Sequence, residues 1–552
     1  MTTSLAEPTD GTTGNTERRS VMLLFIGLMI TMLLASLNQT VLSTALPTIV
    51  GELQGVDQMT WVITAYILAS TIVMPVYGKI SDLLGRKPVL IAAILIFLSG
   101  SVVGALSGNI TWLIFGRILQ GIGGGGLMIL SQAAIADVVP ARERGRYMGF
   151  LGAVFAVSSV AGPLLGGWLT EGPGWRWAFW LNLPLGALAI AATLAFMKLP
   201  KVQHEVRPRL DYLSMALIAG ATTSLVLICT WGGHTYDWLS PQILGLAVAT
   251  VVLAVGFVVA ELRADNPVMP MKLFADRNFT LTTVANLMIG VAMFGALGYM
   301  PTYIQMVTGV DATVAGLLMI PMMGGLLITS IASGQAVART GRYKIFPIIG
   351  SIVMGVGLVL IASMHITTPT WLMCVYLAVF GIGIGLSMQI LTLIVQNSFP
   401  VTMVGTATAA NNYFRQVGAT LGSAVVGSIF ASRLATLLTE KLAGSGAGAG
   451  GDAGRNGLTP AAVNALPDAV RIPIIESYNE ALLPIFLFFV PLAGIALVVL
   501  LFVKEKPLAT TVQREAAEVL TEEELLTEAE MITIEAAEEA GNDKAAATRS
   551  RE

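Results

Sequence analysis

Fourteen long apolar runs, separated by short polar connections, constrain this chain more than any other feature of its sequence. A helix needs about 20 mostly apolar residues to cross the hydrocarbon core of a bilayer. Charged residues make up only 12% of the chain and hydrophobic residues 55%, a balance that excludes an ordinary soluble fold. The sequence therefore predicts an all-α polytopic membrane protein with transmembrane helices at 21–46, 58–78, 88–107, 111–136, 146–169, 177–198, 211–231, 242–262, 278–307, 312–336, 345–364, 370–396, 405–432 and 480–503.

The connection at 78–89 reads Gly-Lys-Ile-Ser-Asp-Leu-Leu-Gly-Arg-Lys-Pro-Val and is too polar to lie in hydrocarbon. A degenerate copy follows at 334–344, in which Ala338 replaces Asp82. Three residues keep their positions in the copy: Gly78, Gly85 and Arg86. The repeat predicts two related six-helix halves, with the seventh and eighth runs inserted between them.

This organisation predicts five segments, each with its own composition. They are a cytoplasmic tail at 1–20, an N-terminal six-helix bundle at 21–200, a linker with two extra transmembrane helices at 201–277, a C-terminal six-helix bundle at 278–505 that carries a flexible external Gly-rich loop at 433–478, and an acidic cytoplasmic tail at 506–552.

Lysine and arginine are sorted between the two sides of the predicted membrane. One set of short connections is basic, as at 79–87, 142–146 and 339–344. In the short connections of the other set, Arg176 is the only lysine or arginine. Because basic loops stay in the cytoplasm, both termini are predicted to be cytoplasmic.

Among the polar residues at membrane depth, where each needs water or a hydrogen-bonding partner, nine are candidates for a shared site. We expect them to outline a central cavity for substrate and coupling: Asn38, Gln39, Arg117, Gln120, Gln389, Asn411, Asn412, Arg415 and Gln416. A static structural ion pair is the alternative for Arg117. For the glycines that follow it, at 121–126, the alternative is close helix packing without chemistry.

A charge cluster is predicted where the second, third and fourth helices meet. Asp82 lies one helical turn before Arg86, and Asp137 at the end of the fourth helix is a second partner for that arginine. The alternative is a solvated surface pair that contributes less than about 1 kcal/mol.

The fifth helix contains glycines on both sides of a proline: Gly152, Gly162, Pro163, Gly166 and Gly167. A proline flanked by glycines favours a bend at which two helical bundles can meet and rock.

These motifs resemble the major facilitator superfamily over about 20–505. The 78–89 loop is similar to that superfamily's signature between its second and third helices, and 117–126 to its fourth-helix signature. The fifth-helix pattern is similar to its antiporter signature, apart from Ala156, where relatives often have glycine. Within the superfamily, 37–47 and 175–186 resemble the fourteen-helix drug:proton antiporters. The resemblance implies an exporter and gives the 78–89 loop, with Asp137, the role of a conformational latch.

One departure concerns the proton carrier. The resembling family usually has Asp where this chain has Asn38, and no Asp or Glu lies near the middle of any apolar run. Because asparagine does not titrate, that residue's role does not transfer to this chain.

The expected function is a secondary-active multidrug exporter of the bacterial cytoplasmic membrane, with no enzymatic activity. The expected partners are a small amphiphilic substrate, a proton gradient and the lipid bilayer, without cofactor, metal or nucleic acid, for a monomeric chain. No nucleotide-binding G-x-x-x-x-G-K-[ST] motif is present. The alternatives are a flippase-like lipid transporter, which predicts a gap between the bundles at mid-depth, and a non-transporting membrane sensor.

Overall fold

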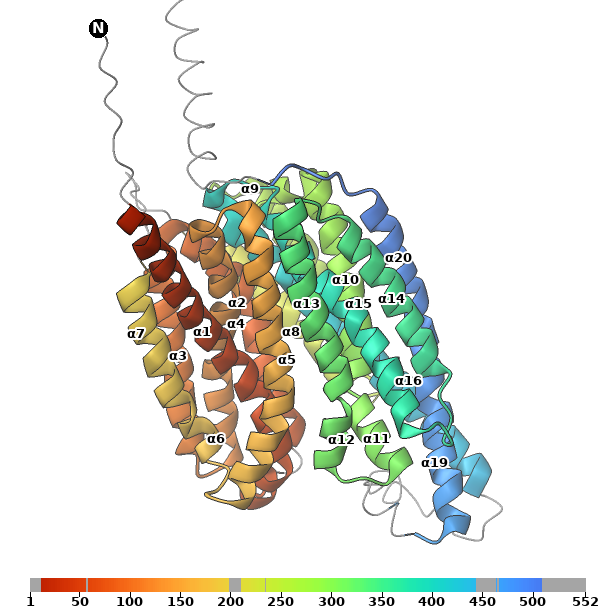
Figure 1. The fold of residues 1–552 in the computed structure, drawn as a ribbon. Helices are drawn as coiled ribbons and strands as arrows, with labels where there is room; N and C mark the ends of the chain where they lie inside the picture. Colours follow the sequence, from red (N-terminus) through yellow and green to blue (C-terminus); the bar gives the residue numbers. More distant parts are fainter. Residues whose placement is uncertain are drawn as a thin grey trace, which may run out of the picture.

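A computed structural model describes residues 11–55, 58–197, 210–233, 235–442, 463 and 466–508. Fourteen helices in this described part are long and apolar enough to cross a membrane, as predicted. They form two side-by-side bundles, the N-terminal half on the left of Figure 1 and the C-terminal half on the right. The predicted acidic tail lies outside the described residues from 509 onward.

The N-terminal half contains six membrane-spanning segments, the last of them divided into two helices. These helices are α1 (Gly11–Glu52), α2 (Met59–Leu84), α3 (Arg86–Ala105), α4 (Ile110–Val138), α5 (Ala141–Glu171), α6 (Trp177–Trp180) and α7 (Asn182–Phe196). Helix α1 begins inside the predicted polar tail and ends beyond its apolar run, because a helix can continue into water after its apolar residues end.

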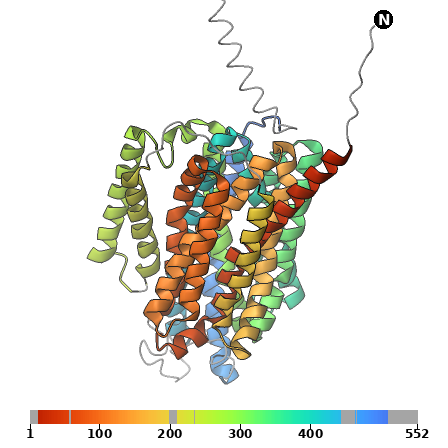
Figure 2. The same cartoon turned by 90° about the vertical axis from the view of Figure 1, so that its left-hand side faces the viewer.

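Two inserted helices, α8 (Tyr212–Trp231) and α9 (Pro241–Arg263), follow the N-terminal half. Asp211 begins α8 by accepting a hydrogen bond from the Ser214 backbone N–H at 3.0 Å, and Ser240 caps α9 in the same way. The pair stands at one edge of the molecule (Figure 2). Helix α8 lies against α2 and α16, whereas α9 is mostly exposed.

The C-terminal half follows the short 3₁₀ helix η2 (Met271–Ala275) and supplies the remaining six spans. Its elements are α10 (Arg277–Leu297), α11 (Met300–Thr308), α12 (Ala312–Leu318), α13 (Ile320–Thr340), α14 (Ile345–Ala362), α15 (Thr370–Gln396), α16 (Val401–Leu442), α19 (Asp468–Leu482), η3 (Leu483–Phe489) and α20 (Val490–Leu501).

Three of the predicted spans in the C-terminal half are interrupted. Prolines stand in the first turn of α11, α13, η3 and α20, where each lacks the N–H that would continue the preceding helix. The predicted spans at 278–307, 312–336 and 480–503 are therefore confirmed as membrane-spanning segments, and each is built from more than one helix.

The predicted external loop at 433–478 is also shorter than expected. Helix α16 extends to Leu442, and α19 begins at Asp468. The Gly-rich centre of the predicted loop lies outside the described residues. Lys441 explains part of the extension, because its ammonium pairs with Glu476 and Glu480 across the two helices.

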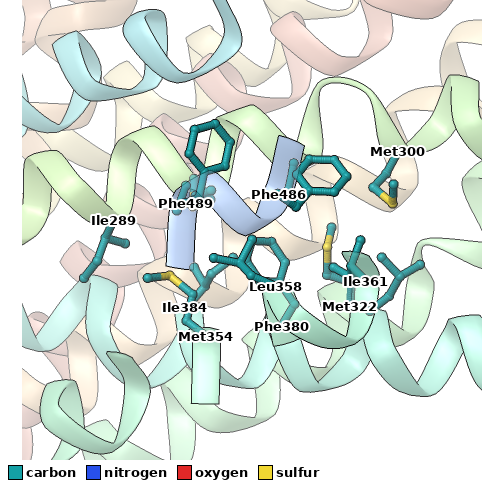
Figure 3. Close-up of a cluster of buried hydrophobic side chains, with 14 of the residues drawn as sticks. Ile289, Met300, Met322, Met354, Leu358, Ile361, Phe380, Ile384, Phe486 and Phe489 are labelled. Atoms are coloured by element: carbon teal, nitrogen blue, oxygen red, sulfur yellow. The ribbon is translucent and has the colours of Figure 1, made fainter. Parts of the chain in front are cut away.

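The core of the C-terminal half is rich in methionine and phenylalanine. Met354, Phe380 and Phe486 are fully buried there, and η3 inserts its phenylalanines between α10 and α14 (Figure 3). Flexible methionine side chains fill irregular gaps of the kind that interrupted helices leave.

The internal repeat is visible in the backbone. Gly85 ends α2 with φ of +87°, and the equivalent Gly341 ends α13 with φ of +73°, a region that favours glycine. Helix α2 packs on α16 of the other half, and its counterpart α13 packs on α5. The two bundles therefore meet along two related helix pairs.

Candidate functional site

The predicted charge cluster is present at the end of α2. Arg86 pairs with Asp82 at 2.5 Å and donates from Nε to Asp137 Oδ2 at 3.2 Å. The Arg86 and Asp82 side chains are 4% and 6% exposed, so this is not a solvated surface pair. We call Gly78, Asp82, Gly85, Arg86 and Asp137 the latch.

The latch also reaches the C-terminal half. Asp82 Oδ2 accepts hydrogen bonds from the Thr406 backbone N–H at 2.7 Å and from its hydroxyl at 2.5 Å. A methyl group at Gly78 would clash with Ala409 of α16, and one at Gly405 would clash with the Arg86 guanidinium. Glycine at these positions lets the two bundles approach closely enough for Asp82 to bond across them.

A second close contact joins α5 to α13. Side chains at Gly145 and Gly149 would meet the backbone of Gly334 and Ser330, and one at Gly152 would meet the Ser330 hydroxyl. At the end of the same pair, Arg142 donates to the backbone carbonyls of Ala338 and Arg339.

The residues of the predicted bend lie on different faces of α5. Of its residues, Gly152 faces the other bundle, whereas Gly162 and Gly166 pack against α1 within the N-terminal half. Thr40 of α1 donates to the Ser158 carbonyl at 2.9 Å, five residues before Pro163. A side chain at Gly167 would meet nothing within 4 Å. The glycines of the predicted bend therefore follow different faces of α5, and Gly152 is the one that lies against α13.

Arg117 lies at the centre of a buried network inside the N-terminal half. Its guanidinium donates to Asn38 Oδ1 at 2.7 Å, to Gln120 Oε1 at 2.8 Å and to the Val62 carbonyl at 3.2 Å. It also lies 4.3 Å from the centre of the Tyr66 ring, a cation–π contact. Among the described residues no carboxylate pairs with Arg117, so the alternative of a static ion pair was wrong.

A second polar cluster crosses between α4 and α16. Asn412 donates to Gln132 Oε1 at 2.9 Å and accepts from Arg415 at 2.7 Å. Asn411 instead faces α10, where Thr283 donates to its side chain at 3.4 Å. Gln389 is buried beside Gly152, and its Oε1 has no hydrogen-bond partner among the described residues.

A cavity of about 490 Å³ lies between the two halves. It is lined by the beginning of α2, the end of α8 and the middle of α16, together with Gln39, Phe294 and Tyr299. The latch joins the end of α2 to the beginning of α16. The cavity therefore lies toward the opposite end of the molecule.

The nine residues predicted for one cavity are thus separated. Gln39 and Gln416 line the cavity, and the other seven do not line it. The reason is that most of these polar groups find hydrogen-bonding partners within or between the packed helices. Sequence reasoning missed Thr406, Gln132 and the aromatic residues Trp61 and Trp231. The first two are neutral polar residues without a motif, and tryptophans near the ends of apolar runs are common at membrane interfaces whether or not they bind a ligand.

The fold and the paired inter-bundle contacts are those of a two-bundle membrane transporter. The sequence model of the Major Facilitator Superfamily matches residues 28–423. The chain belongs to this superfamily, whose members are transporters and not enzymes.

Several relatives carry transport names. The uncharacterized MFS-type transporter Rv1877 of Mycobacterium tuberculosis (strain ATCC 25618 / H37Rv) is 41% identical over 491 residues, which are 89% of this chain and 70% of that protein. The multidrug transporter protein MdtP of Bacillus subtilis (strain 168) is 37% identical and covers 76% of this chain and 77% of its own length. Multidrug resistance protein 3 of the same organism is 29% identical, with coverages of 91% and 98%.

Solved structures agree on the fold. The proton:xylose symporter XylE superposes with a TM-score of 0.59 at 14% identity, covering 90% of this chain and 99% of its own. The human organic anion transporter MFSD10 gives 0.58 at 16% identity, covering 88% and 99%. At these identities the likeness shows the fold alone.

Proposed function

We propose that this transporter exports amphiphilic small molecules by alternating access and that a proton gradient drives it. The observation that carries the proposal is the asymmetry between its two ends. The bundles are bonded together at the latch, and a cavity lies between them toward the other end. Two related bundles that rock about a central site would separate at the latch end while they close together at the cavity end. The multidrug relatives support the same direction of transport.

Transport into proteoliposomes tests this proposal. We expect uptake of an amphiphilic dye such as Nile red into inside-out-oriented vesicles, accelerated at least threefold by an acidic interior. Absence of uptake with and without the gradient would reject export. Equal uptake in both conditions would reject proton coupling alone.

The orientation belongs to the proposal as well: both termini in the cytoplasm of a bacterial cell and the latch on the inner face. In intact cells, single cysteines at the exposed positions Leu106 and Thr235 should react with an impermeant maleimide, and one at Leu84, exposed at the latch end, should not. Reaction at Leu84 alone would invert the topology.

Helix α8 argues against the lipid-transport alternative. It contacts both α2 and α16 beside the cavity, where a lateral opening to the bilayer would otherwise lie between the two halves. We therefore place the substrate path along the bundle interface and not through a side gap.

A further inference from the structure

We propose that the cavity between the two halves binds uncharged aromatic amphiphiles, and that the inserted helix α8 supplies one of its walls. This inference rests on the proposed export function and adds to it the substrate class and a specificity-determining element.

Helix α8 contacts both halves and lies beside the interface between them. The rings of Trp231 of α8 and Trp61 of α2 meet edge to face, with centroids 6.2 Å apart. On the other side, the Thr222 hydroxyl is 2.8 Å from the Tyr413 hydroxyl of α16. Both tryptophans line the cavity and remain partly exposed. An extra helix that only filled lipid space would need no such contacts with both halves.

The lining itself combines aromatic rings with neutral hydrogen-bonding groups. Phe294 and Tyr299 join the two tryptophans, while Gln39 and Gln416 offer amide groups. None of the described residues that line this cavity is charged. Aromatic walls with a few neutral polar groups suit a flat, uncharged ligand that carries one or two polar atoms.

The charges behind the walls disfavour cations. Arg117 bonds to the carbonyl of Val62, directly before the lining residue Ile63, and Arg415 directly precedes the lining residue Gln416. No described carboxylate pairs with either arginine or lines the cavity. A lipophilic cation would therefore meet a positive field without a counter-charge, since charges interact strongly in a medium of low dielectric constant.

The two natural cysteines provide a direct test, because Cys229 lines the cavity and Cys374 does not. The Cys374→Ser protein, reconstituted at full length, keeps one thiol in the cavity, and Cys229→Ser keeps one outside it. We expect saturating Nile red to slow the reaction of Cys229 with N-ethylmaleimide at least threefold and to leave Cys374 unchanged. Ethidium at the same concentration should protect neither thiol. Thr230→Cys in a background without other cysteines is a second reporter in the same wall.

Kinetics test the wall independently. Trp231→Ala should raise KM for Nile red about tenfold with kcat within twofold, whereas Trp371→Ala, which removes a tryptophan that is 67% exposed and outside the cavity, should change neither.

Several outcomes would overturn the inference. The inference fails if Nile red is transported but protects neither Cys229 nor the thiol introduced by Thr230→Cys. It also fails if neither of these thiols reacts at all. In both cases the export function stands. Stronger protection by ethidium than by Nile red would reject the uncharged substrate class. An unchanged KM in Trp231→Ala would remove α8 from the site. Loss of transport for every dye would instead reject the proposed function.

Discussion

Replacement of Asp82 by asparagine tests whether the latch sets the conformational equilibrium. The carboxylate accepts two hydrogen bonds from Thr406 of the other half while it pairs with Arg86. All of these partners are donors. Asparagine is close in shape but carries one amide NH₂ in place of an acceptor oxygen, so one donor group must face another.

The size of the effect follows from these contacts. A hydrogen bond to a charged group contributes about 1.5–3 kcal/mol. Loss of the charge and mismatch of one partner should therefore destabilise the state bonded at the latch by about 2–4 kcal/mol, equivalent to a shift of roughly 30- to 900-fold in the conformational equilibrium. Because a transporter must populate both states in each cycle, we expect the transport rate to fall at least tenfold while expression and folding stay near normal.

Spin labels measure this shift directly. Leu84 and Arg342 are both exposed at the latch end, one in each half, and can carry labels in a background without the two natural cysteines. Electron–electron distance measurements should show a longer and broader separation in Asp82→Asn. Thr406→Ala removes one of the two bonds and should give a smaller change in the same direction.

Asp137→Asn is the matched control, because it removes a charge from the latch whose carboxylate has no hydrogen bond or ion pair to α16 among the described residues. It should disturb the label separation less than Asp82→Asn. If Asp82→Asn leaves both the distance distribution and the transport rate unchanged, the contact between Asp82 and Thr406 does not hold the bundles together, and the reasoning is refuted.

Three shorter predictions follow from the other contacts. Arg117→Lys should lower transport at least tenfold, measured as the initial rate in proteoliposomes. The planar guanidinium donates to three acceptors at once, and the compact ammonium group of lysine cannot reach all three. Asn38→Asp places a carboxylate beside that arginine and should make the rate more strongly pH-dependent; identical pH profiles would show that this position does not handle the proton. Gly149→Val forces a side chain against the Ser330 carbonyl and should lower transport tenfold at a cost of about 1–3 kcal/mol, whereas Gly167→Val, in open space, should have no effect.

The membrane spans could be predicted because apolar length is a direct requirement of the bilayer. The contact between Asn38 and Arg117 was also predictable, since each residue's distance from its helix centre gives its depth. Helix ends and interruptions were harder. Hydropathy does not register a proline within an apolar run, and a helix can continue beyond its apolar part, as α16 does to Leu442.

The contacts between the halves could not be predicted from one sequence. Thr406 lies 324 positions from Asp82, and nothing about a threonine near a helix start marks it as the partner of a distant carboxylate. The same holds for Gln132 and Asn412, which are 280 positions apart. Such pairs depend on how two bundles dock. Small residues such as Gly78 and Gly405 permit the approach but do not specify which polar groups it brings together.

The environment of Arg117 has a consequence for energy coupling. Three neutral acceptors and the face of Tyr66 surround its guanidinium, and these partners offset part of the cost of burying a charge without neutralising it. An aspartate at position 38 could exchange a proton as the bundles rock, but asparagine cannot. Since the middle of every apolar run lacks Asp and Glu, the proposed proton coupling calls for a proton that is exchanged closer to a membrane surface or carried by the substrate itself. Arg117 in this chain therefore holds α1, α2 and α4 together by hydrogen bonds, and its pairing with Asn38 should persist over the pH range in which an aspartate there would titrate.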